Sequence, residues 1–317
     1  MLKINYSKKF DRNLYYKKIS SKYFSIKKNE VLKKHIKGYH KKTITTEEIF
    51  NFFKLNKIAS FDTIFQDISF KCLIIGNLKI LRKIKEQIKT SKDLKENKHI
   101  EFLFNYVALQ QNKIKPFFEE YLDISTCYYC NIDFVNTYNT RGGKKNKFTL
   151  DHYFDKSTYP YLALSLYNFI PSCYTCNSKL KGIHEFNNLA PSSKKYDFDK
   201  KVKFKIKMKK SCNYLHIKSK DDIDIDLKEY FSKDFKNFIE KMYLNERYRV
   251  HKDIVYEMIT KAELYPESRL KELQNLTGIP FQQIKKDIFN LIDEDEDLSK
   301  KPFSKLIKDI SEELQLI

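Results

Sequence analysis

The sequence predicts an α+β fold in which mostly α-helical flanks surround a short central segment of strands. Three observations support this prediction. Apolar residues recur at helical spacing in both flanks. The central segment contains short strand-like runs separated by turn residues. Two C-x2-C pairs, Cys127/Cys130 and Cys173/Cys176, bracket that centre and predict a metal site that staples its ends together.

The N-terminal region, residues 1–122, is predicted to be basic and largely helical. A helix is expected to begin at Thr46, and apolar residues after it follow a helical spacing. Further helices are expected over about 61–91 and 98–122. The first 42 residues are basic and rich in aromatic residues, without a clean period. They either contact nucleic acid or pack against the helical body.

The central region, residues 123–190, is predicted to contain the strands. Gly142-Gly143 indicates a hairpin turn between two short strands. A strand over 147–150 then delivers Asp151-His152 at its end. A short helix over 161–167, a second strand over 168–170 and a helix opening at Cys176 are expected to follow.

The C-terminal region, residues 191–317, is predicted to begin with a short β segment and to continue as helices. Residues 202–208 alternate apolar side chains with lysine, which is typical of a strand. Residues 214–217 are its expected partner. The pattern is helical again from Leu227 to the end.

The charge of the chain favours a polyanionic partner. The 317 residues include 61 Lys and Arg against 41 Asp and Glu, a net charge of +20. Residues 1–50 carry 14 basic against 4 acidic side chains, whereas acidic runs lie at 221–226 and 293–297. This polarity is typical of nucleic-acid binding. No apolar stretch is long enough to span a membrane, and the first residues do not resemble a signal peptide. We therefore expect a cytoplasmic protein without a membrane partner.

The four paired cysteines predict a structural zinc site. Thiolates are soft ligands, and four of them saturate a tetrahedral zinc ion, so no position remains open for catalysis. The other two cysteines, Cys72 and Cys212, are expected to be plain core residues.

Four polar residues lie inside the bracket or next to it: Asp151, His152, Asn168 and Asn177. Hydrolysis of a phosphodiester needs a base that activates water and a cation that stabilises charge on the phosphate. Histidine suits the first role, and carboxylate and amide oxygens suit a hard cation such as Mg²⁺. The alternative is a zinc module that only binds DNA, in which Asp151 caps the chain and His152 packs. A zinc deaminase is excluded, because Phe154 stands where that chemistry needs a glutamate.

The segments LDHYFDKS (150–157), YPYLAL (159–164) and NFIPSCYTCNSK (168–179) resemble the zinc-containing HNH endonucleases. These belong to the ββα-metal, or His-Me finger, nucleases. The similarity covers about a fifth of the chain, residues 127–185. It implies a zinc-stapled ββα-metal core that hydrolyses nucleic acid, with DNA favoured over RNA.

The resemblance also implies a role for each residue of the motif. His152 would be the general base, and Asn168 would orient it and hold the loop. Asp151 and Asn177 would bind a catalytic divalent cation, Mg²⁺ or another. Asn177 stands where many members have a histidine. Lys179 and Lys181 either contact phosphate or form a solvated helix face; His184 and His251 are expected to be structural.

An HNH core within helical flanks is similar to the nuclease partners of bacterial anti-phage systems, including Septu-type and retron-linked pairs. That likeness implies an antiviral defence effector whose nuclease is held in check by an ATPase or another regulatory partner. A non-catalytic zinc-stabilised DNA-binding or scaffold module is the alternative function.

Overall fold

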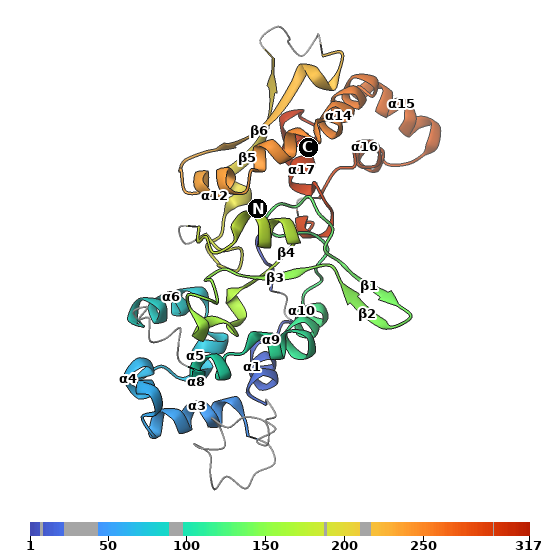
Figure 1. Ribbon diagram of the computed structural model, residues 1–317. Helices are drawn as coiled ribbons and strands as arrows, with labels where there is room; N and C mark the ends of the chain where they lie inside the picture. Colours follow the sequence, from blue (N-terminus) through green and yellow to red (C-terminus); the bar gives the residue numbers. More distant parts are fainter. Residues whose placement is uncertain (7–8, 22–43, 89–97, 187–188, 210–216, 294) are drawn as a thin grey trace.

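The computed structural model describes the chain except for residues 7–8, 22–43, 89–97, 187–188, 210–216 and 294. Its elements are arranged in three successive parts (Figure 1). The N-terminal helices form one end, the short strands of the central region lie in the middle, and the C-terminal strands and helices form the other end. Helices and small antiparallel sheets together confirm the predicted α+β class.

The N-terminal part consists of short helices. They are α1 (Arg12–Ser20), α3 (Thr46–Leu55), α4 (Phe61–Phe65), α5 (Phe70–Ile75), α6 (Leu78–Gln87), α8 (Lys98–Leu103), α9 (Tyr106–Leu109) and α10 (Lys115–Tyr121). The predicted start of α3 is confirmed by a capping box. The Thr45 hydroxyl accepts from the Glu48 amide at 3.0 Å, and the Thr45 amide donates to the Glu48 carboxylate at 2.8 Å.

Helices lie in both predicted ranges, 61–91 and 98–122, but each range is divided into several short helices because polar capping residues interrupt the apolar pattern. Ser69 and Asn77 accept hydrogen bonds from the amides that open α5 and α6. Asn105 does the same for α9. Periodicity alone does not reveal these breaks, since the apolar face continues through them.

The central part contains two antiparallel strand pairs and one helix. The hairpin of β1 (Thr137–Thr140) and β2 (Gly143–Asn146) is the one predicted around Gly142-Gly143. The second pair is β3 (Thr149–His152) with β4 (Phe169–Ser172), and η6 (Thr175–Lys181), wound as a π-helix, follows. The expected helix over 161–167 is instead two 3₁₀ turns, Pro160–Leu162 and Leu166–Asn168.

The C-terminal strand pair corrects the predicted partner of residues 202–208. Strand β5 (Val202–Met208) pairs with β6 (Ile223–Glu229), so residues 223–226 of the acidic run belong to a strand. Its isoleucines and Leu227 are buried, and its aspartates face the lysines of β5; Lys205 lies opposite Asp226. Opposite charges across a strand pair stabilise this register. Residues 214–216 of the expected partner lie outside the described residues.

Helices complete the chain after β6. They are α12 (Lys236–Lys241), α13 (Leu244–Arg249), α14 (Lys252–Leu264), α15 (Glu267–Thr277), α16 (Phe281–Phe289) and α17 (Ser304–Glu313), with the short α11 (Phe198–Lys201) before β5. No helix in the described part of the chain is long and apolar enough to cross a membrane.

The described part of the basic aromatic segment packs against the helical body. Tyr15 is fully buried and donates to the Leu164 carbonyl at 2.9 Å, while Phe10 contacts the Phe117 ring. The prediction for Cys72 was wrong: its side chain is exposed on α5. Cys212 lies outside the described residues.

Candidate metal centre and Asp-His site

The four paired cysteines lie together. The sulfur atoms of Cys127, Cys130, Cys173 and Cys176 are all within 4.8 Å of one another, and all four residues are buried. A tetrahedral ion bonded to four sulfurs at about 2.3 Å separates them by about 3.8 Å, so the cluster has the size that such an ion needs. Among the described residues, no other group of three or more His, Cys, Asp and Glu has this arrangement. The cluster can therefore hold a metal ion such as zinc.

Backbone amides already point at two of the sulfurs. The Ile132 amide donates to Cys130 Sγ, and the Cys176 amide donates to Cys173 Sγ, each at 3.4 Å. The first turn requires a positive φ of 55° at Asn131, a conformation that asparagine tolerates better than most residues. Burial is the largest cause raising the pKa of the Cys127 thiol, and a bound cation would reverse that effect.

The C-terminal part of the chain holds this turn in place through hydrogen bonds. Asn131 is fully buried; its side-chain amide donates to the carbonyls of Leu298 and Lys301, and its oxygen accepts from the Lys305 amide at the start of α17. Arg247 of α13 donates to Cys176 Sγ at 3.3 Å. Its positive charge offsets the negative charge that four thiolates and one divalent ion leave.

Asp151 and His152 of the predicted motif are the last two residues of strand β3. Asp151 lies opposite Ile170 and His152 opposite Phe169 in the β3–β4 pair. Adjacent strand residues point to opposite faces, so the two side chains diverge. Asp151 meets η6, whereas His152 lies on the side of the loop before β4 and of α9. The order strand, strand, helix is the one that the motif implied.

The His152 ring is held by one carbonyl and two aromatic rings. Its Nε2 lies 3.0 Å from the Ala163 carbonyl oxygen, and the rings of Tyr106 and Phe169 pack against it at 4.5 and 4.9 Å. A carbonyl only accepts, so Nε2 carries the proton and Nδ1 keeps its lone pair in the neutral ring. The side chain is 7 % exposed, and its burial lowers the pKa of His152 from 6.5 to about 3.

The low pKa of His152 predicts acid sensitivity. Between about pH 6.5 and pH 3 the unfolded chain binds a proton at this residue and the folded chain does not, so stability falls as the pH falls. We expect this residue to contribute a loss of about 3 kcal/mol in unfolding free energy between pH 7 and pH 4. Urea unfolding at both pH values measures it, and His152→Gln should lose less stability over that interval. An equal loss in parent and variant would contradict the assignment.

Asp151 forms a buried ion pair with Lys181. Its Oδ2 lies 3.1 Å from Lys181 Nζ and accepts from the Tyr129 hydroxyl at 2.6 Å. Lys181 Nζ also donates to the His152 carbonyl at 2.9 Å, and its side chain is fully buried. Burial raises the pKa of Asp151, and the Lys181 ammonium opposes that rise. The expected contact of Lys181 with phosphate, or with solvent, does not match this position, because Asp151 holds the ammonium inside the fold.

Asn168 holds the loop between the two strands. It is fully buried; its side-chain amide donates to the carbonyls of Phe154 and Leu162, and its oxygen accepts from the Phe154 amide at 2.7 Å. The same loop carries the Ala163 carbonyl that contacts His152. Asn168 thus holds the loop that contacts His152, and its side chain is hydrogen-bonded to Phe154 and Leu162 rather than to His152.

Asn177 and Lys179 lie on η6, on its inner and outer sides. The Asn177 amide donates to the Thr149 hydroxyl at 2.9 Å, on the face of β3 that also carries Asp151. Lys179 is exposed, with Nζ 5.8 Å from the centre of the Tyr174 ring. The two remaining histidines have structural contacts: His184 hydrogen-bonds Asn237, and His251 packs against Phe303.

A divalent cation does not fit the Asp151 side chain as the structure has it. Lys181 Nζ already occupies the place beside the carboxylate that a cation would take. The two positive charges would repel one another across a buried space. The predicted cation site on Asp151 and Asn177 therefore gains no support from this arrangement.

Sequence reasoning missed the partners that surround the motif. Tyr129 contacts Asp151, Tyr106 contacts His152, and Arg247 contacts the cysteine cluster. Of these three residues, only Tyr129 could have been suspected from the sequence, because it lies within the first C-x2-C pair. The other two are brought in from distant helices, which spacing in the sequence cannot show.

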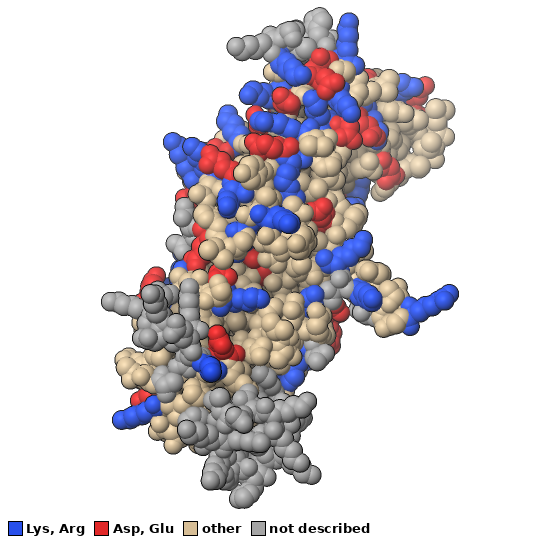
Figure 2. Space-filling model, viewed as in Figure 1, with Lys and Arg blue, Asp and Glu red and all other residues tan. Residues whose placement is uncertain are grey.

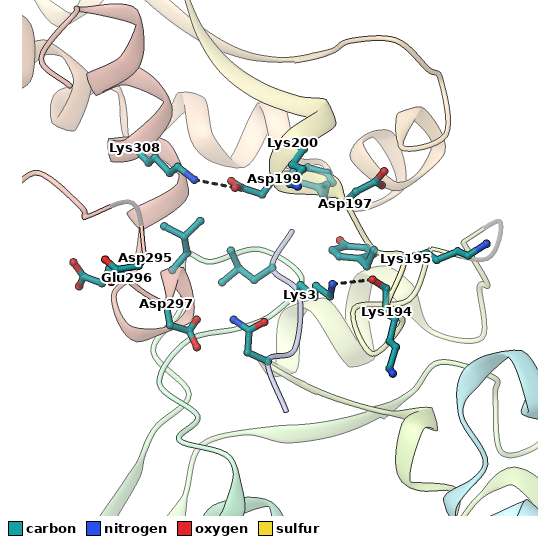
Figure 3. A pocket seen from close by; sticks show the side chains of 15 residues that line it. Lys3, Lys194, Lys195, Asp197, Asp199, Lys200, Asp295, Glu296, Asp297 and Lys308 are labelled. Atoms are coloured by element: carbon teal, nitrogen blue, oxygen red, sulfur yellow. Dashed lines mark hydrogen bonds and ion pairs between the residues drawn. The ribbon is translucent and has the colours of Figure 1, made fainter. Parts of the chain in front are cut away.

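A separate cavity of about 470 Å³ lies between the N-terminal segment and the C-terminal part (Figure 3). None of the predicted site residues lines it. Its lysines alternate with carboxylates, and Lys308 is paired with Asp199 at 2.9 Å. This balance of charge gives the cavity no preference for an anion.

No family model matches the chain, and comparisons with curated proteins and with solved structures find no match.

Proposed function

We propose that this protein is an HNH-type nuclease that hydrolyses phosphodiester bonds of nucleic acid, with DNA as the favoured substrate. The observation that carries the proposal is the neutral imidazole of His152. It ends a strand of a strand–strand–helix unit, and a backbone carbonyl fixes its tautomer. A neutral imidazole can take a proton from water, but with a pKa of about 3 it is a weak base while it is buried, so the proposal requires the ring to become exposed when substrate binds. The net charge of +20 supports a polyanionic substrate.

We infer that the cysteine cluster binds zinc. Four thiolates select zinc over the hard cations, and two amides donate to its sulfurs as well. The cluster joins the chain before β1 to the chain between β4 and η6, so the ion would hold the nuclease unit together. It has no chemical role in the reaction, because its four ligands are complete.

In the proposed reaction, Nδ1 of His152 removes a proton from a water molecule that attacks phosphorus in line. The attack breaks the bond to the 3′ oxygen, which takes a proton from solvent, and the products carry 5′-phosphate and 3′-hydroxyl ends. Lys179, exposed on η6, is placed to neutralise phosphate charge. Because His152 is 7 % exposed beneath Tyr106, α9 has to shift before a polynucleotide reaches the ring.

Replacement of His152 by alanine tests the proposal. Purified parent and His152→Ala proteins are incubated with supercoiled plasmid, linear single-stranded DNA and RNA, with and without Mg²⁺ or Mn²⁺. We expect DNA cleavage by the parent and a rate lower by about 10²- to 10⁴-fold in the variant, since a general base contributes this much. His184→Ala is the matched control, because that histidine hydrogen-bonds a surface asparagine. Equal cleavage by parent and His152→Ala would refute the role of His152.

The same experiment separates the alternative, a non-catalytic DNA-binding or scaffold module. Such a module would bind DNA and leave it intact under every condition, with or without His152. The buried ion pair on Asp151 is the observation that favours it, since it shows how that residue can serve stability alone.

Control by a partner remains part of the proposal. The Tyr106 ring over His152 is a place at which an ATPase or another regulatory protein of an anti-phage system could release the site. Affinity purification from the native host tests this idea, and recovery of no stable partner would count against it.

A further inference from the structure

The β1–β2 hairpin has no face that packs on the rest of the protein. Every described side chain from Tyr138 to Lys147 is exposed, and Thr137 is half-buried. Only its base is anchored, by the buried side chains of Val135 and Phe148. A two-stranded hairpin without a buried face gains little stability from its own contacts. Packing within the fold therefore does not explain why the hairpin projects into solvent (Figure 1), whereas binding to a partner would.

The hairpin is basic and carries no opposing charge. No Asp or Glu occurs from Phe134 to Leu150, whereas Arg141, Lys144, Lys145 and Lys147 all fall in this stretch. Within the described part of the chain, no ion pair involves Arg141, Lys145 or Lys147. Figure 2 shows basic side chains on the projection.

The β5–β6 strand pair differs from this hairpin in the charges that face each other across the strands. There Lys205 and Lys207 of one strand lie opposite Asp226 and Asp224 of the other, so opposite charges face each other in that pair. In β1–β2, Lys145 lies opposite Tyr138, and Lys147 Nζ lies 6.0 Å from the centre of the same ring. One face of the hairpin thus carries Tyr138 together with Lys145 and Lys147, and neither lysine forms an ion pair with a described carboxylate.

The position of the hairpin relates it to the proposed active site. Strand β2 ends at Asn146, and β3, whose last residues are Asp151 and His152, begins at Thr149. At about 3.3 Å per residue, the chain between the hairpin and the Asp-His pair spans no more than the length of one or two turns of a nucleic-acid duplex. A ligand held by the hairpin would therefore be close to β3.

We propose that the β1–β2 hairpin is a ribbon that enters the major groove of a B-form DNA duplex. Arg141, Lys145 and Lys147 contact the phosphates. A two-stranded ribbon fits that groove, which is about 12 Å wide, whereas the major groove of an RNA duplex is too narrow. The partner class rests on the proposed function, but the binding does not depend on hydrolysis.

The test measures binding without cleavage. A fluorescent DNA duplex of random sequence is titrated with the full chain, without divalent cation, over a series of salt concentrations, and gels confirm that the probe stays intact. The variant is Arg141→Ala/Lys145→Ala/Lys147→Ala. We expect its affinity to fall roughly tenfold or more at physiological salt. The slope of log Kd against log salt should decrease by about 2 to 3, since each lost phosphate contact removes about 0.9.

A triple variant elsewhere provides the control. Lys218→Ala/Lys220→Ala/Lys233→Ala removes the same charge from exposed lysines of the C-terminal part and should leave the slope within error of the parent. Thermal unfolding checks that both triple variants are folded. The proposal is overturned if the parent does not bind the duplex, if both triple variants lose the same affinity, or if an RNA duplex binds as tightly and loses as much. If His152→Ala cleaves DNA as well as the parent does, the proposed role of His152 fails but these binding outcomes do not change, so the two proposals fail separately.

Discussion

Removal of the metal is expected to unfold the centre of the protein. A structural zinc ion contributes about 10 to 16 kcal/mol to the folding of small zinc domains, which equals or exceeds the usual total stability of about 5 to 15 kcal/mol. Here the four cysteines tie the chain before β1 to η6, and the C-terminal part is built onto the first cysteine turn through Asn131 and Arg247. Loss of the ion would therefore release more than the turn itself.

The measurement is thermal unfolding, followed by circular dichroism, with the bound metal determined by mass spectrometry. One zinc per chain is expected in the parent, and a strong chelator should lower the unfolding midpoint and remove the cooperative transition. Cys173→Ser should behave like the chelated parent. The matched control is Cys72→Ser, because Cys72 is exposed and outside the cluster. A chelated, zinc-free parent that unfolds at the same temperature would contradict a structural role for the cluster.

Loss of the Asp151 carboxylate is expected to cost about 3 to 5 kcal/mol of unfolding free energy. Asp151→Ala leaves the Lys181 ammonium buried without a counter-charge, and removal of one partner of a buried pair has a cost of this size. The Tyr129 hydroxyl loses its acceptor as well. In Asp151→Ala/Lys181→Met no charge is left behind, and we expect about 2 kcal/mol of the loss to be recovered.

Urea unfolding of the parent, both single variants and the double variant measures this coupling. A surface pair of the same kind is the control: Lys252 and Asp221 are also 3.1 Å apart, but the Asp221 side chain is 72 % exposed. Asp221→Ala should change stability by less than about 1 kcal/mol. If Asp151→Ala is no more costly than Asp221→Ala, the buried pair does not contribute in the way the structure indicates.

The local parts of the fold could be predicted because their causes are local. The helix start at Thr46, the glycine turn of the β1–β2 hairpin and the alternation of β5 all depend on residues close together in the sequence. The C-x2-C pairs belong to the same class, since two cysteines three residues apart can be ligands of one ion. The details that differ from the predictions have equally physical causes. Single capping side chains divide the helical ranges 61–91 and 98–122 into short helices, and β5 pairs with residues 223–229, part of which belongs to an acidic run.

What the sequence determined by itself is the identity of the chemical groups and their order along the chain. It placed four thiols around one aspartate-histidine pair at the end of a strand, and in a basic protein. Only the tertiary structure decided their state. Burial beneath Tyr106 and the Ala163 carbonyl keep the His152 imidazole neutral, and Lys181 forms an ion pair with Asp151. The physical reason is that pKa and charge pairing depend on distance and desolvation, and the folded chain sets both by bringing together residues that the sequence keeps apart.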